Sequence, residues 1–217
     1  WWQNPEHERL VQFMGTDNQR VHTVIYPSCL HGTKDKWTLL HHINTAEYLQ
    51  YEGGKFSKSR NIGVFGDKAK DIGVSPRACR YNLLPTRPES SVSQFVWHDF
   101  VTRNNSELLK NLGNFVNRIM TFMKKYEARL PPLPEGMLLR TDAPLPATSD
   151  GTPWGDLVAK LVADVNAILA KYTEYMDVGK MRAGLMTMME LSARGNLLLS
   201  DAGLDHTLFS EHRDRWA

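Results

Sequence analysis

The apolar residues in the second half of the chain repeat at helical spacing, and this period constrains the fold more than any other feature. From Asp99 onward, one such face consists of Leu108, Leu112, Phe115, Val116, Ile119 and Met123. A second helix is predicted from Leu157, Leu161, Val165, Ile168 and Tyr172, and a third from Met181, Leu185, Met188 and Met189. Residues 131–153 hold six of the eleven prolines, which is typical of a linker. We therefore predict an antiparallel helical bundle over residues 98–217 with a Pro-rich linker at 131–153.

The first hundred residues follow a different pattern, in which short apolar runs are separated by turns. The runs at 21–30, 37–43 and 47–50 favour part of an α/β sheet, although each is too short to distinguish a strand from a buried helix. Residues 53–95 are rich in glycine turns, and Pro76 is well placed to begin a short helix. The sequence thus predicts an α/β part followed by an all-α part.

Composition excludes several classes of protein. The chain has 217 residues, of which 41% are hydrophobic and 23% charged, so a packed core is expected and disorder is disfavoured. A net charge of +2 excludes a histone-like protein but not a local nucleic-acid-binding patch. The two cysteines, Cys29 and Cys79, exclude a disulfide scaffold, and no apolar stretch is long enough for a membrane span. The opening residues lack the features of a secretory signal, and we expect the chain to be part of a longer one.

The clearest chemical motif is a cationic loop that follows a glycine pair, with the sequence Lys55-Phe56-Ser57-Lys58-Ser59. Glycine lets the backbone move and approach a ligand, lysine is a compact charge suited to phosphate oxygens, and the serine hydroxyls add donors. Taken alone, the same residues are more typical of a solvated charged turn.

This loop resembles the KMSKS signature of class I aminoacyl-tRNA synthetases, with Phe56 in place of methionine. Neighbouring segments narrow the resemblance to methionyl-tRNA synthetases of the eukaryotic cytosolic type, and most of all to the fungal ones. The similar segments lie in family order over about residues 1–125, and they are FMGTDN (13–18), HTV (22–24), TAEYLQYE (45–52), RPES (87–90), NNSELL (104–109) and NLGNFVNR (111–118). The segment LSARGN (191–196) matches more loosely. Several collinear segments are far more specific than one short motif.

The resemblance implies a fold and a reaction. Residues 1–54 would form the second half of a Rossmann-like class I synthetase catalytic domain, residues 55–97 the KFSKS loop and stem-contact region, and residues 98–217 an antiparallel helical-bundle anticodon-binding domain. The implied activity is methionine–tRNA ligation, in which ATP, with Mg²⁺, activates methionine to methionyl-adenylate before transfer to methionine tRNA. The implied location is cytoplasmic, and assembly with other synthetases or a tRNA cofactor would use regions outside this chain.

The resemblance also assigns the nucleotide-binding residues. Lys58 is the first choice for neutralising the departing pyrophosphate and Lys55 the second, while Ser57 and Ser59 shape the loop and add donors. Asp17 matches the aspartate that binds the ribose hydroxyls; without the resemblance, it is more simply a turn or helix-cap residue. Tyr48 and Leu49 match the strand whose backbone recognises adenine, and their side chains would belong to the strand core in either case.

Two further sites follow from the resemblance. Asn18, Val21 and His22 match positions that line the methionine pocket, although a lone histidine near an apolar run is usually a satisfied core residue. Asn114 and Arg118 lie four residues apart on one helix face and match the positions that contact the CAU anticodon. From spacing alone, Arg118 pairing with Glu107 or Glu127 is the alternative. A metal site among Cys29, His31, His41 and His42 is rejected because their spacing offers no ligand set.

The chain departs from the family pattern at several positions. Asn61 replaces a usual glycine, Cys79 and Asn82 replace bulkier aromatic residues, and Asp201-Ala202-Gly203 stands where many members carry a proline and a base-stacking tryptophan. Trp216 lies further on and cannot be aligned with that tryptophan. The HIGH signature is absent from these residues, so we expect this chain alone to be inactive. The alternative function is a non-catalytic tRNA-binding or assembly module derived from such an enzyme.

Overall fold

The computed structural model describes residues 1–124, 151 and 153–201. The chain forms two compact units, residues 1–100 and 101–217, and each is described by itself. Apart from residues 151 and 153, the Pro-rich linker predicted at 131–153 lies outside the described residues.

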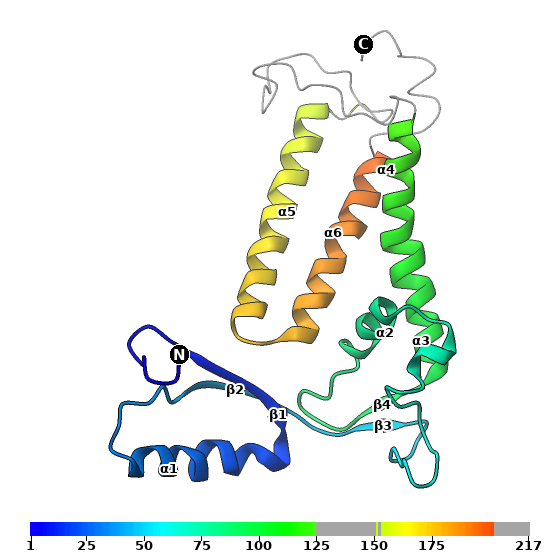
Figure 1. Cartoon of the computed structure of the whole chain (residues 1–217). Helices are drawn as coiled ribbons and strands as arrows, with labels where there is room; N and C mark the ends of the chain where they lie inside the picture. The colour runs from blue at the N-terminus through cyan, green and yellow to red at the C-terminus, as the bar shows by residue number, and fades with distance from the viewer. Residues whose placement is uncertain (125–150, 152, 202–217) are drawn as a thin grey trace. The chain divides into compact units, whose positions relative to one another are not determined.

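The first unit begins with a β-α-β arrangement. Strand β1 (Leu10–Gly15) leads through the 3₁₀ turn η1 (Thr16–Asn18) and the π-helical segment η2 (Val21–Ile25) into helix α1 (Tyr26–Gly32), which is followed by strand β2 (Leu40–Ala46). The two strands pair in parallel from Leu10 with Leu40 to Gly15 with Ala46, and α1 runs along them (Figure 1). The apolar run at 21–30, which sequence alone could not assign, is therefore helical. This arrangement matches the α/β part that the sequence predicts.

A second parallel pair carries the lysine loop. Strands β3 (Leu49–Tyr51) and β4 (Ser93–Phe95) pair from Leu49 with Ser93 to Tyr51 with Phe95, and the intervening chain holds η3 (Ala69–Ile72) and α2 (Pro76–Leu83). Helix α2 begins at Pro76 as predicted, and the Ser75 hydroxyl caps it by accepting a hydrogen bond from the Ala78 amide at 3.2 Å. Neighbouring aromatic rings stack around β3, β4 and the start of α3 (Trp97–Arg103), and these are Tyr51, Phe56, Phe65, Phe95, Trp97 and Phe100.

The second unit is helical. A π-helical segment, η4 (Asn104–Gly113), continues into α4 (Asn114–Lys124), and two long helices follow, α5 (Trp154–Asp177) and α6 (Met181–Asp201). Helix α6 packs against α5 on one side and against η4 and α4 on the other, and α5 runs antiparallel to both of its companions (Figure 1). Three helices of the described residues therefore pack side by side, with α5 antiparallel to the other two. No helix among these residues is long and apolar enough to cross a bilayer.

The predicted buried faces are correct for α5 but partly wrong elsewhere. Leu112, Val116 and Met188 were expected to face the core, yet they are 39%, 49% and 41% exposed. Leu112 lies in η4, where π-helical bonding adds residues to each turn and rotates the apolar face away from the position that a regular 3.6-residue period predicts. Val116 lies in the regular helix α4, next to Phe115, whose ring lies against Gly195 of α6. On α6 the buried face is instead built from small or polar residues and one leucine, namely Gly184, Thr187, Ser192, Arg194, Gly195 and Leu199.

Candidate functional site

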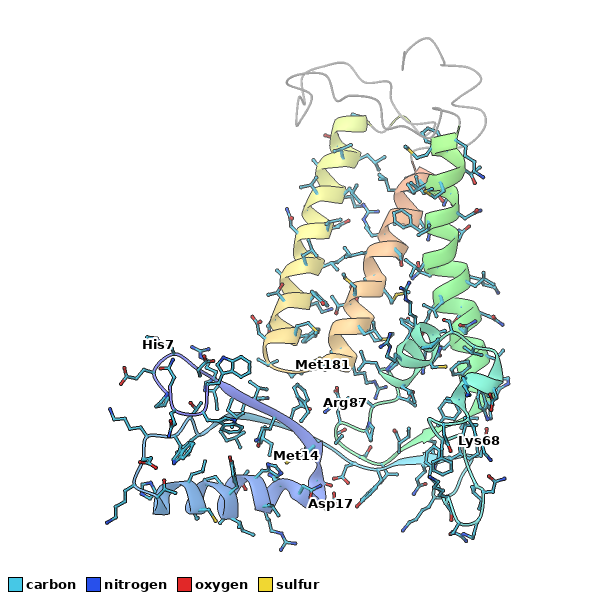
Figure 2. All side chains as sticks on the ribbon, viewed as in Figure 1. His7, Met14, Asp17, Lys68, Arg87 and Met181 are labelled. Carbon is cyan, nitrogen blue, oxygen red and sulfur yellow. The ribbon has the colours of Figure 1, made fainter. Side chains whose placement is uncertain are left out.

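The carboxyl ends of β1 and β2 bring two of the predicted nucleotide-binding residues into contact. Asp17 follows β1 and Tyr48 follows β2, and the Tyr48 hydroxyl donates a hydrogen bond to Asp17 Oδ2 at 2.8 Å. Beside them, the Thr16 hydroxyl lies 3.4 Å from Glu47 Oε2. Figure 2 shows Asp17 at the end of β1, where the chain turns into the helix. Ligands of open α/β sheets bind at this edge, so its position fits a binding site.

The Asp17 carboxylate controls the chemistry of this edge. By accepting a hydrogen bond from the neutral hydroxyl and repelling the phenolate, it raises the pKa of Tyr48 above its ordinary value of 10.0. Its second oxygen, Oδ1, lies close to Gly15, where an added Cβ would stand 2.9 Å away. A carboxylate held in this way can accept hydrogen bonds from vicinal hydroxyls of a sugar.

The predicted methionine-pocket residues lie on η1 and η2. Asn18 and Val21 are exposed, whereas His22 is half-buried and its Nδ1 lies 3.2 Å from Gln12 Oε1 on β1. Gln12 was not identified from the sequence, because its relation to His22 depends on η2 packing back against β1. The bond holds the imidazole on the sheet and so fixes a polar group beside exposed apolar surface.

The glycine pair before the lysine loop forms a tight turn. Glu52 and Gly53 both have positive φ, 46° and 81°, and Tyr51 and Gly54 exchange backbone hydrogen bonds of 2.8 and 2.9 Å. These features are those of a type I′ turn, which needs glycine or a tolerant residue at its centre. The Glu52 carboxylate also accepts a hydrogen bond from the Trp97 amide at 2.8 Å. The base of the loop is thereby tied to the start of α3.

The lysine loop itself is a short hairpin. Ser57 and Ile62 pair through backbone bonds of 3.0 and 2.9 Å, and Asn61 adopts the left-handed conformation with φ of 54°. Asparagine tolerates this conformation better than most residues, so it can stand where the resemblance leads us to expect glycine. The ring of Phe56 packs 5.2 Å from that of Tyr51 between centroids and anchors the hairpin to the aromatic cluster.

The side chains of the loop leave its positive charges open to solvent. Lys55 and Lys58 are exposed, and neither ammonium group has a hydrogen bond or ion pair among the residues described. Ser57 and Ser59 lie with their hydroxyl oxygens 3.4 Å apart, and Arg60 Nε donates to the Ser57 hydroxyl at 3.2 Å. The hairpin therefore presents a cluster of cations and hydroxyl donors suited to an anion.

In the second unit, the predicted anticodon residues meet on one asparagine. The Asn114 side-chain amide donates to Asn196 Oδ1 at 3.1 Å, and Arg118 Nη1 donates to the Asn196 carbonyl at 3.0 Å and the Ser200 hydroxyl at 3.3 Å. Arg118 therefore does not pair with Glu107, which lies 3.7 Å from Arg103 Nε. Glu127 and the segment expected to hold a stacking aromatic lie outside the described residues. Asn196 was not identified as a partner from the sequence, because it is 82 residues from Asn114.

Two remaining expectations concern metals and core substitutions. In the described ranges, no group of three His, Cys, Asp or Glu side chains could hold a metal ion.

Asn82, at a position where the resemblance leads us to expect a bulkier aromatic residue, is 1% exposed and donates a hydrogen bond to the Ala78 carbonyl at 2.9 Å. Its amide nitrogen is thus bonded within α2. Cys79 is half-buried.

Comparison with known proteins identifies the family. Residues 1–120 match the model described as tRNA synthetases class I (M). The chain is 51% identical over 216 residues to the cytoplasmic methionine–tRNA ligase of Saccharomyces cerevisiae, which covers 99% of this chain and 26% of that protein. It is likewise 51% identical over 218 residues to the probable cytoplasmic methionine–tRNA ligase of Schizosaccharomyces pombe, covering 100% of this chain and 26% of that one. The chain therefore spans about a quarter of the length of these relatives.

Solved structures support the same fold. Mycobacterium tuberculosis methionyl-tRNA synthetase bound by methionyl-adenylate aligns with a TM-score of 0.68 over 88% of this chain and 33% of that chain, at 21% identity. At this identity the likeness concerns the fold alone. It is the class I synthetase catalytic-domain fold with additional helices.

Proposed function

Because this chain belongs to the tRNA synthetases class I (M) family, the methionyl-tRNA synthetases, we propose that it is part of a cytoplasmic methionine–tRNA ligase. The observation that carries the proposal is the contact of Asp17 with Tyr48 at the carboxyl edge of a parallel strand pair that leads into a KFSKS hairpin. We assign residues 1–54 to the second half of the catalytic domain, 55–97 to the KFSKS and stem-contact region, and 98–217 to the anticodon-binding bundle.

The exposed apolar face of β1 supports the assignment to a larger catalytic domain. Val11 and Phe13 alternate with half-buried residues along the strand and are 46% and 51% exposed. Parallel sheets in α/β proteins normally have both faces covered. We propose that the HIGH-containing half of the enzyme covers this face. This chain alone would then lack aminoacylation activity.

In the proposed complex, ATP spans the first unit. Asp17 accepts hydrogen bonds from the ribose hydroxyls, and Tyr48 and Leu49 place backbone groups against adenine. The Tyr48 hydroxyl now occupies one Asp17 oxygen, so ribose binding has to share or displace it. Mg²⁺ would travel with ATP, bound mainly by phosphate oxygens and water.

The lysine hairpin supplies the charge that the activation step requires. When the methionine carboxylate attacks the α-phosphorus, negative charge accumulates on the departing pyrophosphate. Lys58, assisted by Lys55 and the Ser57 and Ser59 hydroxyls, stabilises that charge more than the charge of bound ATP, which lowers the barrier. Because both ammonium groups are exposed and unpaired among the described residues, no ion pair has to be broken first.

The two other substrates would occupy the remaining sites. Methionine would lie against Asn18, Val21 and His22, with the Gln12-oriented imidazole as the polar contact. Methionine tRNA would place its anticodon on Asn114 and Arg118. The Nε and Nη2 atoms of Arg118 make no hydrogen bond within the described part of the chain. An arginine in this state can both hydrogen-bond and stack on a single-stranded base.

The test is methionine-dependent ATP–pyrophosphate exchange by the longer enzyme that contains this chain. Lys58→Ala should lower kcat about a hundredfold, as expected for losing a charge aimed at the transition state. The matched control is Lys68→Ala, an exposed lysine in a neighbouring turn, which should retain activity. Normal exchange by the Lys58→Ala enzyme would refute the role of the hairpin. Tight binding of methionine tRNA without any exchange by the unmodified enzyme would instead favour the non-catalytic module.

A further inference from the structure

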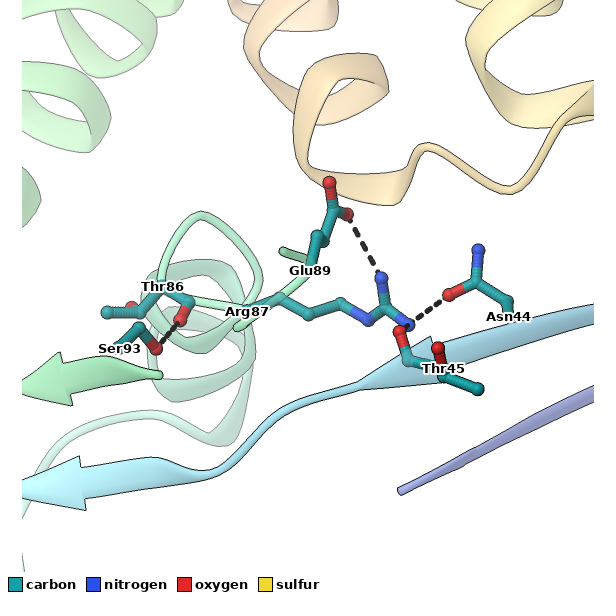
Figure 3. Close-up of polar contacts among 6 residues, drawn as sticks. All are labelled: Asn44, Thr45, Thr86, Arg87, Glu89 and Ser93. Carbon is teal, nitrogen blue, oxygen red and sulfur yellow. Dashed lines mark hydrogen bonds and ion pairs between the residues drawn. The ribbon is translucent and has the colours of Figure 1, made fainter. Parts of the chain in front are cut away.

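Arg87 joins the two parallel strand pairs of the first unit, although it belongs to none of the sites described above. Its side chain is 16% exposed, and Nη1 donates to Glu89 Oε1 at 3.1 Å. On the other side of the guanidinium, Nη2 donates to Asn44 Oδ1 and lies 3.5 Å from the Thr45 carbonyl, both on β2 (Figure 3). One planar group thus bridges the segment before β4 and the end of β2.

The backbone on either side of Arg87 is held at the same place. The Glu47 amide donates to the Pro88 carbonyl at 2.8 Å, and the Ser93 amide donates to the Tyr48 carbonyl at 3.2 Å. Figure 3 also shows the Ser93 hydroxyl bonded to the Thr86 carbonyl, which closes the segment on itself. Residues 86–93 therefore brace the link between β2 and β3 from one side.

That link is where the two ends of the nucleotide site are joined. Only Glu47 and Tyr48 separate β2 from β3, and β3 runs directly into the turn that begins the lysine hairpin. Tyr48 contacts Asp17, so the direction of the chain at this link sets where the lysines stand relative to the Asp17 carboxylate. Asn44 also pairs in register with Phe13 of β1, which places the Arg87 contact on the same strand pair as Asp17.

We propose that Arg87 is a positioning residue that sets the lysine hairpin relative to the Asp17–Tyr48 edge, an inference that rests on the proposed function. A guanidinium has a rigid fork of donors and can bond Glu89 and Asn44 at the same time, which the single ammonium of lysine cannot do in one orientation. ATP must engage the edge with its ribose and the hairpin with its phosphates. A small shift between these two groups lowers the rate even when each can still bind.

Activation kinetics of the full-length enzyme separate positioning from simple stabilisation. We expect Arg87→Gln and Arg87→Lys to lower kcat for methionine-dependent ATP–pyrophosphate exchange about tenfold to a hundredfold. The KM for methionine should stay unchanged, because η1 and η2 have no bond to Arg87. Rates are normalised to the folded fraction, measured as the stoichiometry of methionine binding. Arg77→Lys, an exposed arginine on α2, is the matched control and should behave as the unmodified enzyme.

The partner on β2 supplies a second, independent set of variants. Asn44→Asp keeps an oxygen acceptor for Nη2 and should retain kcat, whereas Asn44→Leu removes it and should reproduce the Arg87→Gln loss. Combining Asn44→Leu with Arg87→Gln should add little to either change, because both break the same contact.

Three results would decide against the inference or its premise. If folded Arg87→Gln and Asn44→Leu enzymes keep a normal kcat, Arg87 does not position the hairpin. If kcat falls only in proportion to the folded fraction, its role is stability alone, and the inference is equally wrong. If the unmodified enzyme shows no methionine-dependent exchange, the proposed function fails before Arg87 is tested.

Discussion

Replacing Gly195 with alanine should loosen the packing of α6 against α4. A Cβ at this buried position would lie 2.4 Å from Phe115 Cε2 and 2.6 Å from Cζ, so the ring has to move. Overpacking of this kind costs about 1–3 kcal/mol, while the higher helix propensity of alanine returns about 1 kcal/mol. The net expectation is a loss of up to about 2 kcal/mol in the local free energy of unfolding.

Two other helical glycines serve as controls for this prediction. Gly155, in α5, has no neighbouring atom within 4 Å of an added Cβ, so Gly155→Ala should be neutral or slightly stabilising. At Gly184 the nearest atom is Met176 Sδ at 2.7 Å, and a flexible thioether can move more easily than an aromatic ring. Gly184→Ala should therefore have an intermediate effect.

Hydrogen–deuterium exchange of the α6 amides in the full-length enzyme measures the effect locally. Gly195→Ala should exchange up to about 30 times faster than the unmodified protein, which corresponds to the expected loss of up to about 2 kcal/mol. Phe115 lies between Asn114 and Arg118 on α4, so binding of methionine tRNA should weaken as well. Replacing the Phe115 ring with the smaller leucine side chain makes room for the added methyl group. The double variant Gly195→Ala/Phe115→Leu should therefore regain part of the protection of the α6 amides from exchange. Equal exchange in the Gly195→Ala and Gly155→Ala proteins would refute the packing argument.

Three further predictions concern single residues of the candidate sites. The Tyr48 phenol should titrate above its ordinary pKa of 10.0, and its contribution to stability should be complete below that pH and lost as pH rises through the raised pKa. Asp17→Asn should lower this pKa in an ultraviolet titration read as the difference from Tyr48→Phe. Gly15→Ala would place a Cβ 2.9 Å from Asp17 Oδ1 and turn the carboxylate aside, so the KM for ATP should rise about tenfold with little change in thermal stability. Arg118→Ala should weaken binding of methionine tRNA by about 1–3 kcal/mol and remove its preference over a tRNA with an altered anticodon; an unchanged preference would exclude Arg118 from the site.

Local sequence signals predicted helix starts and buried helix faces correctly where a single local effect determines them. Pro76 begins α2 because proline has the right φ and needs no amide donor at that position. The predicted apolar face of α5 is buried or half-buried along its whole length, because the helix is regular. The same period failed at Leu112, because the π-helical bonding of η4 changes the number of residues per turn. Nothing in residue type alone distinguishes that segment from an ordinary helix.

Whether a contact at the sites could be predicted from the sequence depended on the structure that lies between its two residues. Asp17 and Tyr48 are 31 residues apart, but a parallel β-α-β arrangement always brings its strand ends together, so their meeting follows once the strands are known. The Arg87 bridge spans 43 residues to Asn44 and crosses between two strand pairs, which no local pattern encodes. The family resemblance identified the RPES segment without indicating this role.

The contacts of Asn196 show how tertiary packing can fix the chemistry of a site that sequence identifies only by position. Its two amide hydrogens are directed at the Asn111 and Ser192 carbonyls, at 2.9 and 3.1 Å, so the orientation of the amide is determined by acceptors that cannot be exchanged for donors. Its Oδ1 must then face Asn114, which accordingly directs its NH₂ group at this oxygen and keeps its own Oδ1 as an acceptor. An adjacent Arg118 with one nitrogen engaged completes a surface with one acceptor and several donors, the mixture needed to recognise the edges of unpaired bases.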